Sequence, residues 1–214
     1  MSNPKNPYNG TGRLDNCGFC AISYGLHLQQ GKQVDAEKLF RETMARLKIE
    51  GDFPRTLLFN EANLDQIPTP THRTILSTGT RSPHQYTIQH VATESGLKYA
   101  SGFPEYLWQY AQIYNAFDYT KALRQMATVR HNNALDAGRI EDNPDTFYRD
   151  VTTKLMGDAI VGSITGRHFL NVRISPSGLM EGFDPQVNEP FPGRDLLLRV
   201  RGPISLFMRL PPGR

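Results

Sequence analysis

The stretch NCGFCAIS, residues 16 to 23, opens the first helical pattern of the chain. Apolar residues then recur at intervals of three and four, the spacing of one helix face, and Gly31 stands where such a helix would end. Asn16, with Asp15 before it, is a residue type that favours the N-cap position. We therefore expect a helix whose first residue is Cys17. The apolar residues of this pattern are Phe19, Ile22, Leu26 and Leu28.

The rest of the chain divides into a helical part and a strand-rich part. Residues 51 to 82 are rich in Pro, Thr and Asn, which favours loop. Further helices are predicted at about residues 35–48, 83–95, 104–114 and 119–132. Strands are predicted from DAIVGSIT (158–165), HFLNVRIS (168–175), GLMEGFD (178–184), and the final stretches LLLRVR (196–201) and SLFMRL (205–210).

This order, with helices first and an antiparallel sheet last, is the α+β pattern. The 214 residues suit a single domain, and no linker divides them. We expect one domain over residues 1–214, in which residues 1–16 form an irregular N-terminal arm.

Composition excludes several classes of protein. No run of about 18 apolar residues occurs, so we expect no membrane span. The polar N-terminus also lacks the apolar core of a secretory signal. The net charge of +3 is small, and no dense basic block appears, so we expect no nucleic-acid partner. The two cysteines make no disulfide framework, which fits a reducing compartment.

Three residues have the types and positions that cysteine catalysis needs. Cys17 lies at a predicted helix start, where the unpaired N–H groups and the helix dipole favour a thiolate. His168 opens one predicted strand, and Asp184 closes the next. A hairpin between them would place both at one end of the sheet, where the carboxylate can hold one imidazole nitrogen. The backbone N–H of Cys17 and the side chain of Asn16 are candidate oxyanion donors.

Two segments resemble a known family. NCGFCAIS resembles the nucleophile segment of papain-fold toxin and effector domains, and is similar to the corresponding stretch of OTU-type deubiquitinases. RHFLNVRISPSGLMEGFDPQ, residues 167–186, is similar to the second half of the toxin signature. The resemblance implies a papain-like fold, with Cys17 as nucleophile, His168 as base, Asp184 as acid and Gln186 as a supporting residue.

Two features depart from papain itself. Papain carries a Gln six residues before its nucleophile as an oxyanion donor, whereas this chain has Thr11 or Leu14 there, counted from Cys17 or Cys20. In papain the second cysteine of Cys-Gly-Ser-Cys is catalytic, which leaves Cys20 as an alternative nucleophile. We favour Cys17 because Asn precedes the nucleophile in the toxin and OTU patterns.

Other interpretations of the same residues stay open. The CGFC motif is also typical of a thiol–disulfide oxidoreductase, but such motifs follow a strand, which the polar arm does not predict. The thiols with His27 make an incomplete zinc set, so we expect no metal and no cofactor. A non-enzymatic binding domain would keep the three residues without aligning them.

The resemblance also implies a biological setting. We expect a cysteine protease or protein glutamine deamidase that acts on a protein substrate as a toxin or effector, with a cognate inhibitor as a second partner. A deubiquitinase-like isopeptidase is the nearest enzymatic alternative. We expect a cytoplasmic location, or delivery into a target-cell cytosol by a non-classical secretion route.

Overall fold

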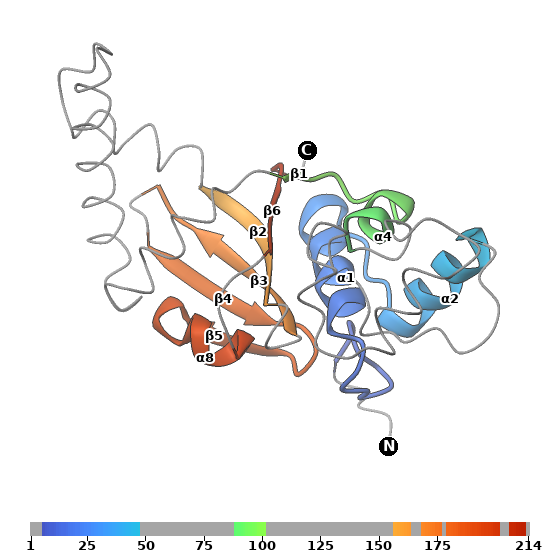
Figure 1. Ribbon diagram of the computed structural model, residues 1–214, viewed down its shortest axis with the longest axis horizontal. Coiled ribbons are helices and arrows are strands. Elements are labelled where there is room, and N and C mark those ends of the chain that lie inside the picture. The colour runs from blue at the N-terminus through green and yellow to red at the C-terminus, as the bar shows by residue number, and fades with distance from the viewer. Residues whose placement is uncertain are drawn as a thin grey trace, which may run out of the picture.

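Helices α1, α2 and α4 precede the antiparallel sheet in the described residues, and only the short helix α8 lies among the strands, so the fold class is α+β, as predicted (Figure 1). Helix α1 lies between the sheet on one side and helices α2 and α4 on the other. The computed structural model describes residues 6–47, 88–101, 156–163, 168–176, 179–201 and 206–212.

Helix α1 spans Cys17–Gln30 and begins at the predicted residue. Gly31 ends it in the left-handed conformation, with φ of 67°, and donates its N–H to the carbonyl oxygen of His27 at 2.8 Å. Such a C-terminal residue is most often Gly because any other side chain is strained at positive φ. The predicted start and end of this helix are both confirmed.

The second predicted helix is α2, Ala36–Leu47. Asp35 precedes it, and its Oδ1 accepts the backbone N–H groups of Glu37 and Lys38, which is a side-chain N-cap. The helix predicted over 83–95 is present as α4, Ile88–Glu94, in its described part. The predictions for residues 51–82, 104–114 and 119–132 lie outside the described residues.

The core between α1 and its neighbours is apolar. Phe19 is fully buried and meets the ring of Phe40, on α2, edge to face at 5.3 Å between centroids. Gly25 faces the sheet, where an added Cβ would lie 3.2 Å from side-chain atoms of both Leu210 and Leu97. A glycine at this position therefore allows α1 to pack closely on the last strand.

In the part of the chain that the structure describes, the sheet has six strands in the order β1-β6-β2-β3-β4-β5, and every neighbouring pair is antiparallel. Helix α1 contacts β3 and β2, so it packs on the centre of the sheet. The strands are β1 (Ala100–Ser101), β2 (Gly157–Ser163), β3 (His168–Ile174), β4 (Met180–Asp184), β5 (Glu189–Pro192) and β6 (Leu206–Leu210).

One strand prediction is wrong and one strand was missed. LLLRVR forms a short helix, α8 (Leu196–Val200), which follows the 3-10 turn Gly193–Asp195. Leu196 and Val200, four residues apart, are buried, whereas Leu198 is 78% exposed, which is the pattern of a helix turn and not of a strand. The missed strand β5 contains Pro190 and Pro192, and it lies at the sheet edge, where proline is tolerated.

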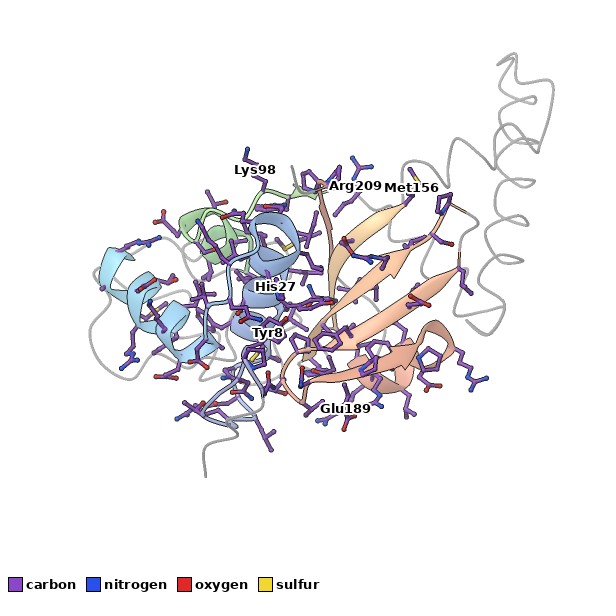
Figure 2. The ribbon with its side chains drawn as sticks, turned by 180° about the vertical axis from the view of Figure 1, so that it is seen from behind. Tyr8, His27, Lys98, Met156, Glu189 and Arg209 are labelled. Atoms are coloured by element: carbon purple, nitrogen blue, oxygen red, sulfur yellow. The ribbon has the colours of Figure 1, made fainter. Side chains whose placement is uncertain are left out.

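As expected, the described part of the arm, residues 6–16, forms no helix or strand. It nevertheless makes specific contacts with the rest of the protein. Tyr8 is 5% exposed and packs edge to face on Tyr24 of α1 and Phe183 of β4. Its hydroxyl lies 2.5 Å from Nδ1 of His27, and Figure 2 shows these two side chains next to each other where the arm meets α1. The Gly10 N–H donates to Asp35 at 2.7 Å. The arm is thus fixed to α1, α2 and β4.

Within the described ranges, none of the helices combines the length and the apolar character that crossing a membrane requires.

The assignment of α8 as a helix can be tested with two leucines that lie two residues apart. Leu196→Ala should lower the free energy of unfolding by about 2–5 kcal/mol, because it empties a fully buried site. Leu198→Ala should change it by less than about 0.5 kcal/mol, because that side chain is exposed. Urea denaturation of both variants gives the comparison. Equal losses would favour the strand, in which both side chains share one face.

Candidate active site

Sheet topology brings His168 and Asp184 to the same end of the sheet. His168 is the first residue of β3 and Asp184 is the last residue of β4. At this end of the sheet the last pair of the hairpin is Asn171 with Phe183, and Asp184 is the next residue of β4. His168 lies three residues before Asn171 on β3, beyond the same last pair.

The predicted contact between the acid and the imidazole is present. Nε2 of His168 lies 2.7 Å from Oδ2 of Asp184, and both side chains are buried. The other carboxylate oxygen, Oδ1, accepts the backbone N–H of Gln186 at 3.1 Å. Because each oxygen has a donor, the carboxylate is fixed in orientation, and it holds the imidazole ring in one orientation as well.

Cys17 reaches the same imidazole from α1. Its side chain is 4% exposed and is hydrogen-bonded to His168. Since Nε2 faces Asp184, Nδ1 is the ring nitrogen on the side of the sulfur. Cys17, His168 and Asp184 therefore come together from three different elements, α1, β3 and β4.

The surroundings of His168 favour its charged form. Burial lowers the pKa of the imidazole, but the hydrogen bonds to Asp184 and Cys17, together with the charges of both groups, outweigh burial and raise the pKa from 6.5 to about 9. The ring is therefore an imidazolium at neutral pH.

Cys20 has different surroundings, although it is only one helix turn away. It is fully buried, and burial, together with the nearby Cys17 and Asp184, raises the pKa of its thiol well above 9.0. Its Sγ lies 3.4 Å from Oδ1 of Asn16. A buried thiol of this kind behaves as a small apolar group with a weak S–H donor.

The two predicted supporting residues, Asn16 and Gln186, contact each other. Nε2 of Gln186 donates to Oδ1 of Asn16 at 3.2 Å, and Nδ2 of Asn16 donates to Oδ1 of Asn9 at 3.0 Å. Asn16 is the N-cap residue of α1 by position, but its side chain caps no helix N–H. Instead it connects helix α1 to the segment that follows Asp184.

Asn6 and Asn9 also belong to the site region, although their sequence context did not predict it. Both are buried, and their side-chain amides donate to backbone carbonyls at Pro185 and Gln186. The arm was assigned as irregular because Asn, Pro and Gly favour turns. The side chain of Asn also forms hydrogen bonds readily with backbone groups two or three residues further along the chain. This tendency is the one feature of the sequence that could have indicated a role for Asn6 and Asn9.

Asn171 joins strand β3 to helix α1. It is buried on β3, and its Nδ2 donates to the carbonyl oxygen of Ala21, one turn along α1 from Cys17. This contact fixes the distance between α1 and β3 close to the site.

The described residues contain no cluster of three or more His, Cys, Asp or Glu side chains suited to a metal ion. No protein-family model matches the chain, and neither a curated protein nor a solved structure matches it. The catalytic roles of the three residues, and the resemblance to papain-fold toxins, therefore remain predictions.

Stability should depend on pH through His168. The pKa of the folded imidazole, about 9, exceeds its ordinary value of 6.5, so its contribution is complete below pH 6.5 and is lost as pH rises through about 9. The contribution amounts to at most about 3 kcal/mol. We expect the difference in unfolding free energy between the wild type and His168→Ala to shrink over this range, as measured by urea denaturation. A difference that stays constant with pH would contradict the raised pKa.

Proposed function

We propose that this protein is a cysteine-dependent amide hydrolase of papain-like architecture, with Cys17 as nucleophile, His168 as general base and Asp184 as the residue that orients the base. The observation that carries the proposal is a single imidazole ring held between two groups. Asp184 lies 2.7 Å from one ring nitrogen, and the Cys17 side chain, at the start of α1, is hydrogen-bonded to the same ring.

The proposed reaction has two halves. The Cys17 thiolate attacks the amide carbonyl carbon, and the C–N bond breaks as the His168 imidazolium gives its proton to the leaving nitrogen. A thioester on Cys17 remains. Water then attacks the thioester carbon while His168 takes up a proton, and the thiolate leaves. Asp184 keeps the ring in one orientation through both halves.

The oxyanion that forms in each half requires N–H donors. The first N–H groups of an α-helix have no partner within the helix, and the dipole is positive at this end. We therefore assign the backbone N–H of Cys17 as one donor. Asn16 is the second candidate: one hydrogen of its Nδ2 goes to Asn9, and an amide nitrogen carries two.

Two further features support the papain-like architecture. A helix that carries the nucleophile at its first residue packs on an antiparallel sheet that carries the base and the acid. The two segments that resemble papain-fold toxins, residues 16–23 and 167–186, include all three residues of the proposed triad.

The substrate that this resemblance favours is a protein amide. A peptide bond would make the enzyme a protease, and a glutamine side chain would make it a deamidase, with the same acyl chemistry at Cys17. The proposed setting is that of a toxin or effector that acts on a cytosolic protein and is inhibited by a cognate protein. A deubiquitinase-like isopeptidase uses the same residues and differs only in the amide it cleaves.

Two observations weigh against the non-hydrolytic alternatives. The described residues before Cys17, 6–16, form no strand, whereas a redox Cys-x-x-Cys motif of the thioredoxin type follows one. A binding domain that kept only the fold would have no reason to align the imidazole with both the carboxylate and the sulfur.

Proteomics of cells that express the wild type or Cys17→Ala would test the proposal and name the amide. New protein N-termini that appear only with the wild type would identify a protease, and Gln-to-Glu mass shifts a deamidase. In parallel, iodoacetamide should modify Cys17 faster than a free thiol near neutral pH. The proposed function would be refuted if Cys17 reacted with iodoacetamide no faster than a free thiol and the cells expressing wild type and Cys17→Ala had identical proteomes.

The identity of the nucleophile can be tested with a matched pair of variants. Cys17→Ala should lower turnover at least about a thousandfold, because no acyl intermediate can form. Cys20→Ala should keep most of the activity, because that thiol is buried and un-ionised. Hydrolysis of the protein substrate found above is the measurement. An inactive Cys20→Ala beside an active Cys17→Ala would assign the nucleophile to Cys20.

Two replacements of Asp184 test whether this residue orients the His168 ring. Asp184→Asn should retain more turnover than Asp184→Ala, because an amide oxygen can still accept from Nε2 of His168. The loss with Asn should be smaller than the roughly 10⁴-fold found for the same change in serine triads, since a cysteine nucleophile depends less on activation by the base than a serine hydroxyl does. Equal turnover of the two variants would remove the orienting role of this residue.

A further inference from the structure

Asn6 uses both ends of its side-chain amide. Oδ1 accepts the backbone N–H groups of Tyr8 and Asn9, at 3.0 and 3.2 Å, and so forms the turn of the arm. Nδ2 points the other way and donates to the carbonyl oxygens of Pro185 and Gln186, at 2.9 and 3.1 Å. The side chain is 2% exposed. One buried amide thus joins the arm to the backbone that follows Asp184.

Asn9 makes a second connection of the same kind. Its Nδ2 donates to the carbonyl oxygens of Arg13 and Gln186, both at 2.8 Å, and its Oδ1 accepts from Asn16 at 3.0 Å. Two asparagines therefore converge on the carbonyl of Gln186, and one of them also reaches the N-cap residue of α1. Asn16 in turn accepts from the Gln186 side chain, which closes the network.

We propose that Asn6 and Asn9 are positioning residues of the active site, which hold the Asp184 turn (residues 184–186) against the Cys17 end of α1. The effect on catalysis rests on the proposed function, whereas the effect on His168 does not.

The path from these asparagines to the imidazole is short. The backbone N–H of Gln186 donates to Oδ1 of Asp184, and Oδ2 of the same carboxylate contacts Nε2 of His168. If the amides of Asn6 and Asn9 are removed, the carbonyls of Pro185 and Gln186 lose their buried donors and the Asp184 turn is free to shift. The carboxylate then loses its fixed position relative to His168.

The same arm is also anchored away from the site, which supplies a matched control. Asp35 accepts the N–H of Gly10 and caps the start of α2, and it makes no bond to residues 184–186 in the described contacts. Loss of this anchor should destabilise the fold without moving the carboxylate. If Asn6 and Asn9 had a purely structural role, replacing them would lower the stability of the fold without moving the Asp184 carboxylate, as expected for Asp35.

The experiment is an NMR titration of the His168 imidazole in the 214-residue chain, comparing wild type, Asn6→Ala, Asn9→Ala and Asp35→Ala. Asp184 from β4 and Cys17 from α1 are the titratable groups that raise the imidazole pKa from 6.5 to about 9. In both asparagine variants we expect this pKa to fall by about one unit or more, because the contact with the carboxylate weakens. Asp35→Ala should titrate like the wild type at a lower melting temperature.

The outcomes separate this inference from the proposed function. If His168 titrates in Asn6→Ala and Asn9→Ala as in the wild type, the positioning role is wrong, whatever the enzyme does. If the wild type hydrolyses no amide and its Cys17 reacts slowly with iodoacetamide, the proposed function fails, while the titration still decides the role of the asparagines. Should Asn6→Ala not fold, Asn9→Ala carries the test, because it leaves the turn made by Oδ1 of Asn6 intact.

Discussion

The contact between His168 and Asp184 sets the requirements for the rest of the described structure. A carboxylate and an imidazolium buried together are favourable only when the geometry is good and the remaining polar atoms have partners. Oδ1 of Asp184 has such a partner in the backbone N–H of Gln186, and the imidazole has a second partner in Cys17. The pair is thus held from both sides, which is what keeps the imidazole charged at neutral pH.

The need to fix the position of Asp184 explains why the irregular arm makes so many buried hydrogen bonds. The ladder between β4 and β5 ends with the pair Asp184 and Glu189, so Pro185 and Gln186 of the Asp184 turn lie beyond its last pair. Carbonyls at Pro185 and Gln186 take their donors from Asn6 and Asn9 instead, across 177 to 180 residues of sequence. Tyr8, between those asparagines, packs on α1 and β4 and anchors the arm where it is needed. Hydrogen bonds from side chains therefore hold the backbone of this turn in place, as strand pairing holds the backbone elsewhere in the sheet.

The elements that were predicted well are those with strong local signals. Helix α1 has apolar residues at helical spacing and a glycine stop, and strands β2, β3, β4 and β6 have short apolar runs between turns. LLLRVR gave an ambiguous signal, because a run of apolar residues this short suits a strand or a helix turn equally. Burial of Leu196 and Val200, with Leu198 exposed, is a property of the packing and could not be derived from the run itself.

The sequence by itself determined the class of the fold, the first residue of helix α1 and the strand ends that carry His168 and Asp184, because periodicity, caps and turns are local. Tertiary structure alone decided which thiol lies against the imidazole and which is buried as an apolar group. Cys17 and Cys20 are three residues apart, and only packing makes their surroundings differ. It also decided the roles of Asn6 and Asn9, since the hydrogen bonds of an asparagine depend on which backbone groups the fold brings within 3 Å of it.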